Sequence, residues 1–153
     1  MKSRLPILIV SLFVLSLAAR AADDPLVGTW NLNVAKSKYS SGQVPQRQTL
    51  KFEPFGTGLK LTNQVMNAQG TQTSFPSIYV FDGQDYGIPY TPFSFTNRRI
   101  DANTTERVIK NGANAMVTTR RVVSKDGKTL TITHAGKDSA GKDVSATLVY
   151  GKQ

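Results

Sequence analysis

From Val27 onward, apolar and polar residues alternate in short runs that are separated by turns containing glycine. Alternation with a period of two is typical of a β-strand with one buried face, because successive side chains point to opposite faces. Such runs recur at intervals of roughly 8 to 12 residues, which favours an all-β sandwich or barrel. They cover Val27–Val34, Gln46–Phe55, Leu59–Met66, Thr71–Phe81, Pro92–Ile100, Thr104–Lys110, Asn114–Ser124, Thr129–His134 and Val144–Tyr150.

The turns between these runs favour an antiparallel up-and-down meander. Asn111-Gly112 and Asp126-Gly127 are pairs that tolerate the positive φ of tight hairpins. A meander of half-apolar strands removes its exposed edges by closing, so we expect a barrel of eight to ten strands. Alternation predicts that these residues face inward: Trp30, Leu32, Val34, Leu50, Phe52, Leu59, Leu61, Leu130, Ile132, Val144, Ala146, Leu148 and Tyr150.

The first 21 residues have the order of a secretory signal peptide. A basic start precedes an apolar stretch that ends at the triplet Ala19-Arg20-Ala21, after which we expect cleavage. The alternative is a membrane anchor, but the stretch is shorter than the roughly 20 residues that a spanning helix needs. We therefore expect residues 22–153 to form one β-barrel domain that is periplasmic or secreted and has no transmembrane segment.

Composition narrows the classes of partner. The chain has no cysteine, so disulfides cannot stabilise it and thiolate metal sites are excluded. The formal net charge of +9 falls to +6 without Lys2, Arg4 and Arg20 of the predicted signal peptide. The remaining basic residues are scattered, and no exposed face interleaves them with aromatic residues, so we expect no nucleic-acid partner.

The single tryptophan, Trp30, lies in the segment LVGTWNLNV. Gly28 allows a sharp bend into the first strand, and the indole then fills one end of the barrel. This segment resembles the Gly-x-Trp opening of the calycin barrels, which include lipocalins and fatty-acid-binding proteins. DGKTLTIT followed by VSATLVYGKQ resembles the closing hairpin of the fatty-acid-binding branch. GTWNLNVAKSKY, RRVVSKDGKTLT and the final VYGKQ also resemble small secreted bacterial proteins whose function is largely unassigned.

The resemblance implies a calycin-like barrel whose interior holds a small apolar or amphipathic molecule. Tyr150 matches the closing tyrosine of the fatty-acid-binding pattern. The arginine that meets a ligand carboxylate in that branch falls at Leu148, so this contact is absent. A helical lid is also absent, since only the eleven residues AKSKYSSGQVP connect the first two strands. The arginine that packs over the tryptophan in lipocalins is missing, because no arginine follows Arg121.

Three further residues are candidate polar anchors inside the barrel. Adjacent strand residues face opposite ways, so one arginine of each pair, Arg98-Arg99 and Arg120-Arg121, points inward. Counting along the strands selects Arg99 and Arg121, each of which needs a carboxylate, backbone or ligand partner. A salt bridge at the barrel rim, or a bulge that turns the arginine outward, is the alternative. His134 is a satisfied rim residue, a donor to a ligand headgroup, or one axial ligand of a haem.

The segment FDGQDYGIPYTPF stands apart from the regular runs. Its prolines exclude a central strand and limit it to an edge, a bulge or a loop. It is either a portal loop that carries aromatic surface over one barrel mouth or a well-packed Ω-type loop.

We find no catalytic or metal-binding constellation in the sequence. The carboxylates lie mostly in turns, and no Gly-x-Ser-x-Gly elbow occurs. The favoured hypothesis is a binding protein for a small apolar or amphipathic ligand, without a cofactor. The alternatives are a structural or interaction protein of the envelope whose barrel is filled by side chains, and an enzyme or haem protein of the same fold. The candidate ligand-binding residues are Trp30, Arg99, Arg121, His134, Leu148 and Tyr150.

Overall fold

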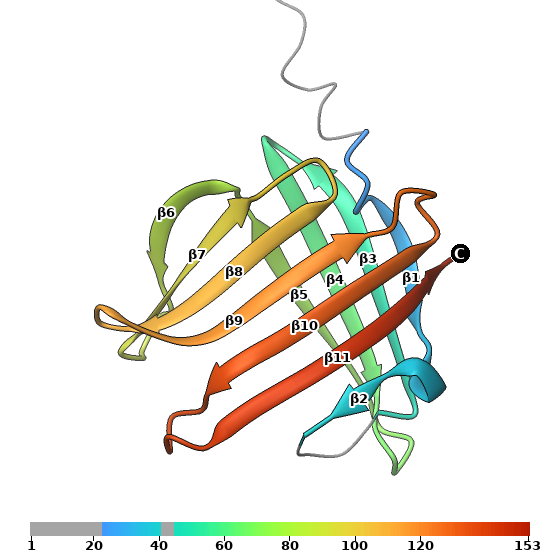
Figure 1. The fold of residues 1–153 in the computed structure, drawn as a ribbon. Helices are drawn as coiled ribbons and strands as arrows, with labels where there is room; N and C mark the ends of the chain where they lie inside the picture. Colours follow the sequence, from blue (N-terminus) through green and yellow to red (C-terminus); the bar gives the residue numbers. More distant parts are fainter. Residues whose placement is uncertain (1–22, 41–44) are drawn as a thin grey trace, which may run out of the picture.

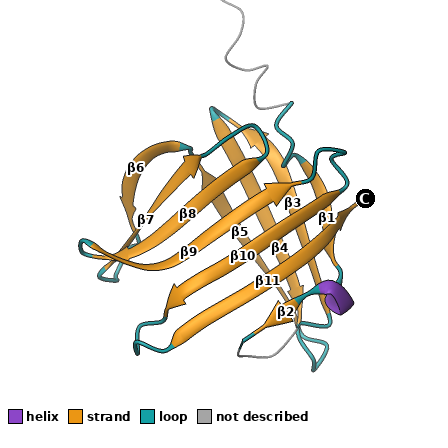
Figure 2. Ribbon diagram, in the orientation of Figure 1, coloured by secondary structure: helices purple, strands orange, loops and turns teal. Residues whose placement is uncertain are grey.

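The computed structural model describes residues 23–40 and 45–153, which form one curled antiparallel sheet (Figure 1). Figure 2 shows that strands make up most of the described chain. The predicted signal peptide, residues 1–21, lies outside the described residues. The elements are β1 (Gly28–Leu32), a 3-10 turn η1 (Val34–Lys36), β2 (Lys38–Tyr39), β3 (Arg47–Phe55), β4 (Gly58–Met66), β5 (Gln72–Tyr79), β6 (Asp82–Gly87), β7 (Phe93–Arg99), β8 (Thr104–Asn111), β9 (Asn114–Val123), β10 (Thr129–Lys137) and β11 (Asp143–Lys152).

The strands follow one another as an antiparallel meander, in the order β5-β4-β3-β1-β11-β10-β9-β8-β7-β6. β1 pairs with β3 on one side and with β11 on the other, so the first and last strands are hydrogen-bonded neighbours. Trp30 lies opposite Leu50 of β3 and Lys152 of β11. The all-β, up-and-down fold predicted from the alternation is therefore confirmed.

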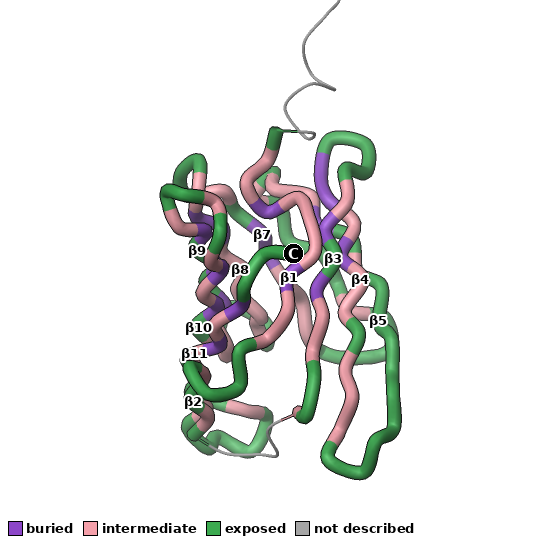
Figure 3. Tube along the Cα trace, turned by 90° about the vertical axis from the view of Figure 1, so that its right-hand side faces the viewer, coloured by how far each residue is buried: buried purple, intermediate pink, exposed green. Residues whose placement is uncertain are grey.

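The expected closure of the sheet by backbone pairing is wrong. β5 and β6 are consecutive in the chain, yet they form the two ends of the sheet order and do not pair with each other. The sheet is therefore a curled half-barrel with eleven strands instead of a closed barrel with eight to ten. β5 contains Pro76, β6 has an irregular register between Asp82 and Asp85, and both features are typical of sheet edges. Figure 3 shows β5 exposed along most of its length.

Two local predictions are also corrected. Val34 was expected to face inward with Trp30, but it begins η1 and is exposed. The side chain of Asn33 accepts a hydrogen bond from the backbone N–H of Lys36 and caps this turn, which ends the regular strand before Val34. The segment FDGQDYGIPYTPF, which its prolines limit to an edge, a bulge or a loop, contains the edge strand β6, so it is not a loop throughout; the turn that follows has Tyr90 fully exposed at a φ of 62°.

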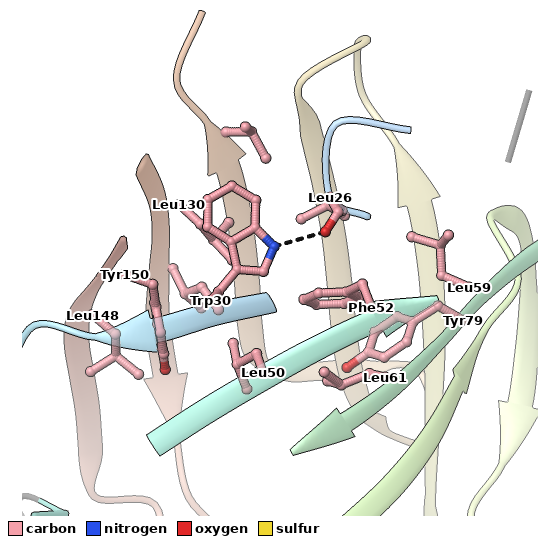
Figure 4. Packing of buried hydrophobic residues seen from close by; sticks show 12 residues of the cluster. Leu26, Trp30, Leu50, Phe52, Leu59, Leu61, Tyr79, Leu130, Leu148 and Tyr150 are labelled. Carbon is pink, nitrogen blue, oxygen red and sulfur yellow. Dashed lines mark hydrogen bonds between the residues drawn. The ribbon is translucent and has the colours of Figure 1, made fainter. Parts of the chain in front are cut away.

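The hydrophobic core gathers around Trp30, which is completely buried, as the alternation predicts. The indole Nε1 donates a hydrogen bond to the backbone oxygen of Leu26 at 2.8 Å, and Figure 4 shows this contact. Gly28 enters β1 with a φ of 133°, in the region that favours glycine. The buried residues of this core are Leu26, Trp30, Leu50, Phe52, Leu59, Leu61, Tyr79, Val123, Leu130, Ile132, Leu148 and Tyr150. We call the part of the core formed by Leu26, Trp30, Phe52, Leu59, Val123 and Leu130 the packed end.

Candidate ligand-binding site

The inward-facing residues change from apolar to polar along several strands. On β3 the inward positions run from Phe52 through Leu50 to Gln48. On β10 they run from Leu130 through Ile132 to His134. β4 and β9 change in the same direction, from Leu61 to Asn63 and from Val123 to Arg121 and Thr119. The barrel interior therefore has two ends of different chemistry.

A cavity of about 250 Å³ lies beyond the packed end. The wall of this cavity is formed by both apolar and polar side chains. They come from strands on both sides of the half-barrel. We call this part the hollow end. The cavity is lined by Gln48, Leu50, Leu61, Asn63, Phe75, Ser77, Tyr79, Arg107, Arg121, Ile132, His134, Leu148 and Tyr150.

Arg121 is the most deeply buried charged group of the hollow end, with 7% of its surface exposed. Its Nη2 donates a hydrogen bond to the Tyr79 hydroxyl at 2.9 Å, and its Cζ lies 4.8 Å from the centroid of that ring. The Nε atom is buried and has no hydrogen-bond partner among the described residues. A buried guanidinium without a carboxylate partner is energetically costly, and the hydrogen bond to Tyr79 supplies no counter-charge.

Arg107, on the neighbouring strand β8, also lines the cavity. Its Cζ lies 4.1 Å from the centroid of Tyr79 and 4.4 Å from the centroid of Phe95, and its Nε donates to Asn97 Oδ1 at 2.8 Å. Burial lowers the pKa of the Arg107 guanidinium, and the charge of Arg121 lowers it further. The two arginines therefore raise the positive potential of one small volume.

The opposite wall carries a short chain of neutral hydrogen bonds. The Tyr150 hydroxyl donates to Gln48 Oε1 at 3.0 Å, and Gln48 Nε2 donates to Asn63 Oδ1 at 3.0 Å. Burial raises the pKa of Tyr150, so its hydroxyl keeps its proton at neutral pH and remains a donor. This wall offers polar contacts without adding a second charge to the cavity.

His134 lies where the cavity meets a second, more open space. Its Nδ1 is 2.9 Å from Thr119 Oγ1, and burial followed by the charge of Arg121 lowers its pKa. The ring is therefore neutral at neutral pH. His134 also lines an open groove of about 440 Å³ between β2 and strands β10 and β11, where Tyr39 has a buried hydroxyl without a partner among the described residues.

The structure brings together four of the six candidate residues predicted from the sequence. Arg121, His134, Leu148 and Tyr150 line the cavity. Trp30 does not line it and belongs to the packed end.

Arg99, the sixth candidate, also lies away from the cavity. It forms an ion pair with Asp24, and its Cζ lies 4.7 Å from the centroid of Phe81. This contact is the rim salt bridge that the sequence left open as the alternative for an inward arginine.

Sequence reasoning missed Arg107, which the structure places beside Arg121. Its run, TTERVIK, has apolar residues on both faces, so alternation does not assign a direction. The register between β8 and β9 shifts at Ile109 and leaves Met116 without a partner residue on β8. The inward positions of β8 therefore cannot be derived from those of β9 by counting residues through the hairpin. Counting back from the strand pairing of Thr105 with Arg121 places Arg107 on the inward face.

The described residues contain neither a cluster of three or more potential metal ligands nor a long apolar helix. No such group of His, Asp and Glu side chains occurs in residues 23–40 and 45–153. Within the same ranges, no helix is long and apolar enough to cross a membrane.

Comparisons with known proteins show which solved structures have a similar fold. No protein-family model matches the sequence, and no curated protein matches it. A Schistosoma mansoni fatty-acid-binding protein solved with arachidonic acid has a TM-score of 0.57 at 13% identity, covering 84% of this chain and 96% of its own. As-p18, an extracellular fatty-acid-binding protein, has a TM-score of 0.55 at 17% identity, with 85% and 97% covered.

A third similar structure is a secretory abundant heat soluble (SAHS) protein from Ramazzottius varieornatus. It has a TM-score of 0.53 at 11% identity, and the match covers 85% of this chain and 96% of that protein. These likenesses confirm the calycin-like fold that the Gly-x-Trp segment and the closing hairpin predict.

Proposed function

We propose that this protein is an exported binding protein that holds one small amphipathic ligand in the hollow end. The anionic headgroup of the ligand lies against Arg121 and accepts a hydrogen bond from the Tyr150 hydroxyl, which exchanges its bond to Gln48 for this one. Its apolar part lies against the apolar side chains of the cavity, which are Leu50, Leu61, Phe75, Ile132 and Leu148.

The observation that carries this proposal is the unpaired guanidinium of Arg121. Among the described residues, none of the ion pairs involves Arg121, and no Asp or Glu lines the cavity. An anionic headgroup would supply the missing charge and an acceptor for the buried Nε atom. The hydrogen bond to Tyr79 leaves the charge itself uncompensated.

Two further observations support a ligand of this class. Two of the similar structures are fatty-acid-binding proteins, and one of these is extracellular. The basic and apolar start of the chain, followed by Ala19-Arg20-Ala21, supports export. Both proteins bind fatty acids, in agreement with a binding role.

Calorimetric titration with octanoate and octanol tests the proposal on the mature chain. Wild type should bind octanoate at one site and octanol more weakly. Arg121→Gln should weaken octanoate binding about 10- to 100-fold, the effect of losing a charge-assisted hydrogen bond. Tyr150→Phe should have a smaller effect, because it removes a neutral donor. Arg120→Gln is the matched control, since Arg120 is the next residue and is exposed.

Two results would contradict the proposal. If neither probe binds wild type saturably, the hollow end does not hold an amphiphile of this size. If Arg121→Gln and Arg120→Gln bind octanoate equally well, the buried guanidinium does not contact the headgroup.

A further inference from the structure

The hollow end contains two cationic side chains and no anionic one. Arg107 and Arg121 both line the cavity, whereas none of its lining residues is Asp or Glu. No ion pair between described residues involves either arginine. Because the pKa of His134 is lowered, this ring adds no charge at neutral pH. The cavity therefore presents two positive charges, and one carboxylate would neutralise only one of them.

Arg107 is held in one orientation by its neighbours. Its guanidinium stacks between the rings of Tyr79 and Phe95, at 4.1 Å and 4.4 Å from their centroids. Its Nε donates to Asn97 Oδ1, and this is its one side-chain hydrogen bond within the described residues. The terminal nitrogens remain as donors for another group. Stacking on aromatic faces fixes the guanidinium plane without neutralising its charge.

The two arginines lie close together on one face of the sheet and line the same cavity. Arg107 lies opposite Thr119, and Arg121 lies opposite Thr105, so the arginines are diagonal neighbours on one face of the β8–β9 ladder. Such positions are about 7–8 Å apart at Cα. Both guanidinium groups also lie within 5 Å of the same ring, that of Tyr79. Long arginine side chains from these positions converge on one volume rather than on two separate sites.

We infer that Arg107 and Arg121 together select an amphiphile whose headgroup carries two negative charges at one centre, as a phosphate monoester does. The inference deepens the proposed function and rests on it. Each guanidinium donates to a different oxygen of the tetrahedral headgroup, so both buried charges gain a counter-charge. A phosphate monoester is largely dianionic above its second pKa of about 6. A carboxylate satisfies only part of the same site.

The cavity volume limits the remainder of this ligand. About 250 Å³ lies below the range of roughly 300–1,000 Å³ that is usual for sites of drug-sized ligands. A short alkyl chain fits beside the headgroup, whereas a long chain has to leave the cavity. Phe75 of the edge strand β5 lines the cavity while 56% of its surface is exposed, so a longer chain would leave the cavity past Phe75.

Octyl phosphate and octyl sulfate are matched probes for this inference at pH 8. They share a tetrahedral headgroup and the same chain, but the sulfate carries one negative charge and the phosphate carries two. Wild type should bind octyl phosphate about 10- to 100-fold more tightly than octyl sulfate. Arg107→Gln should remove most of this preference, Arg107→Lys should retain part of it, and Arg120→Gln should leave it unchanged.

Phosphorus NMR on the wild-type complex provides a measurement that does not depend on whether a variant folds. The chemical shift of bound octyl phosphate reports its second protonation. Between two guanidinium groups, the bound phosphate should remain dianionic to a lower pH than free octyl phosphate. Retention of the free ligand's titration curve would overturn the inference.

The outcomes separate this inference from the proposed function. If octanoate binds, but octyl phosphate and octyl sulfate bind with equal affinity and Arg107→Gln alters neither, the two-charge site is wrong and the binding function stands. If none of octanoate, octyl sulfate and octyl phosphate binds to wild type, both the proposed function and this inference fail.

Discussion

The packed end and the hollow end are built from the same strands, yet they differ in what fills them. At the packed end, Trp30, Phe52 and Leu130 are almost completely buried and leave no room for a ligand. At the hollow end, polar side chains take the corresponding inward positions and surround a cavity of about 250 Å³. The barrel interior is therefore divided between a packed core and a polar cavity, which we propose to be the binding site. A buried apolar cluster holds the strands together, so the other end can keep charges that a core would exclude.

The largest difference between the two ends should be in stability. Trp30→Ala should lower the free energy of unfolding by roughly 3–5 kcal/mol, the range for removing a large aromatic side chain from a core. Urea unfolding followed by circular dichroism measures this loss. The octanoate affinity of the folded variant should stay close to that of wild type, because Trp30 does not line the cavity. A loss below about 1 kcal/mol would show that the indole is not part of a tight core.

At the hollow end, a substitution should change stability in the opposite direction. Arg121→Met replaces a buried, uncompensated charge with an apolar side chain of similar length. We expect the free energy of unfolding to rise by about 1–3 kcal/mol while octanoate binding is lost. Arg120→Met is the exposed control and should stay within about 0.5 kcal/mol of wild type. If Arg121→Met destabilises the protein by as much as Trp30→Ala does, the hollow end is an ordinary part of the core.

A smaller effect should come from the pH dependence of stability at His134. Because its pKa is lowered from 6.5 in the folded protein, the unfolded chain binds more protons than the folded chain below about pH 6.5. Its contribution to stability is thus complete above pH 6.5 and is lost as the pH falls through the folded pKa. Urea unfolding at several pH values between 8 and 5 should show this loss in wild type. The curve of His134→Gln should lack it, and parallel curves for the two proteins would contradict the assignment.

The sequence predicts most of the fold because alternation depends on local chemistry. The half-buried strands β3 and β4 have clear periodic runs, and the structure contains both almost as predicted. β6 is not predicted because glycine and proline interrupt the alternation of its segment. β2 is not predicted because a strand of two residues is too short to show any alternation. The break between β5 and β6 is also missed, because consecutive strands pair by default and alternation carries no information about pairing.

The candidate site is less predictable than the fold for a related reason. Arg121 follows from alternation, because Val117, Thr119 and Val123 keep one phase along β9. The inward orientation of Arg107 does not follow from alternation, because a register shift at Ile109 interrupts the pairing between β8 and β9. The shared contact of both arginines with Tyr79 joins residues that are more than 25 positions apart in the chain. Only the three-dimensional arrangement shows that their charges are close together.

The most direct test of the account is to locate octanoate inside the barrel. Intermolecular nuclear Overhauser effects between its alkyl protons and methyl-labelled protein identify the side chains that it contacts. We predict contacts with the methyl groups of Leu61, Ile132 and Leu148, which line the cavity, and none with Leu26 or Leu130 of the packed end. Saturable binding without contacts to any of these cavity methyl groups, or with contacts confined to the outer face of the sheet, would contradict the account.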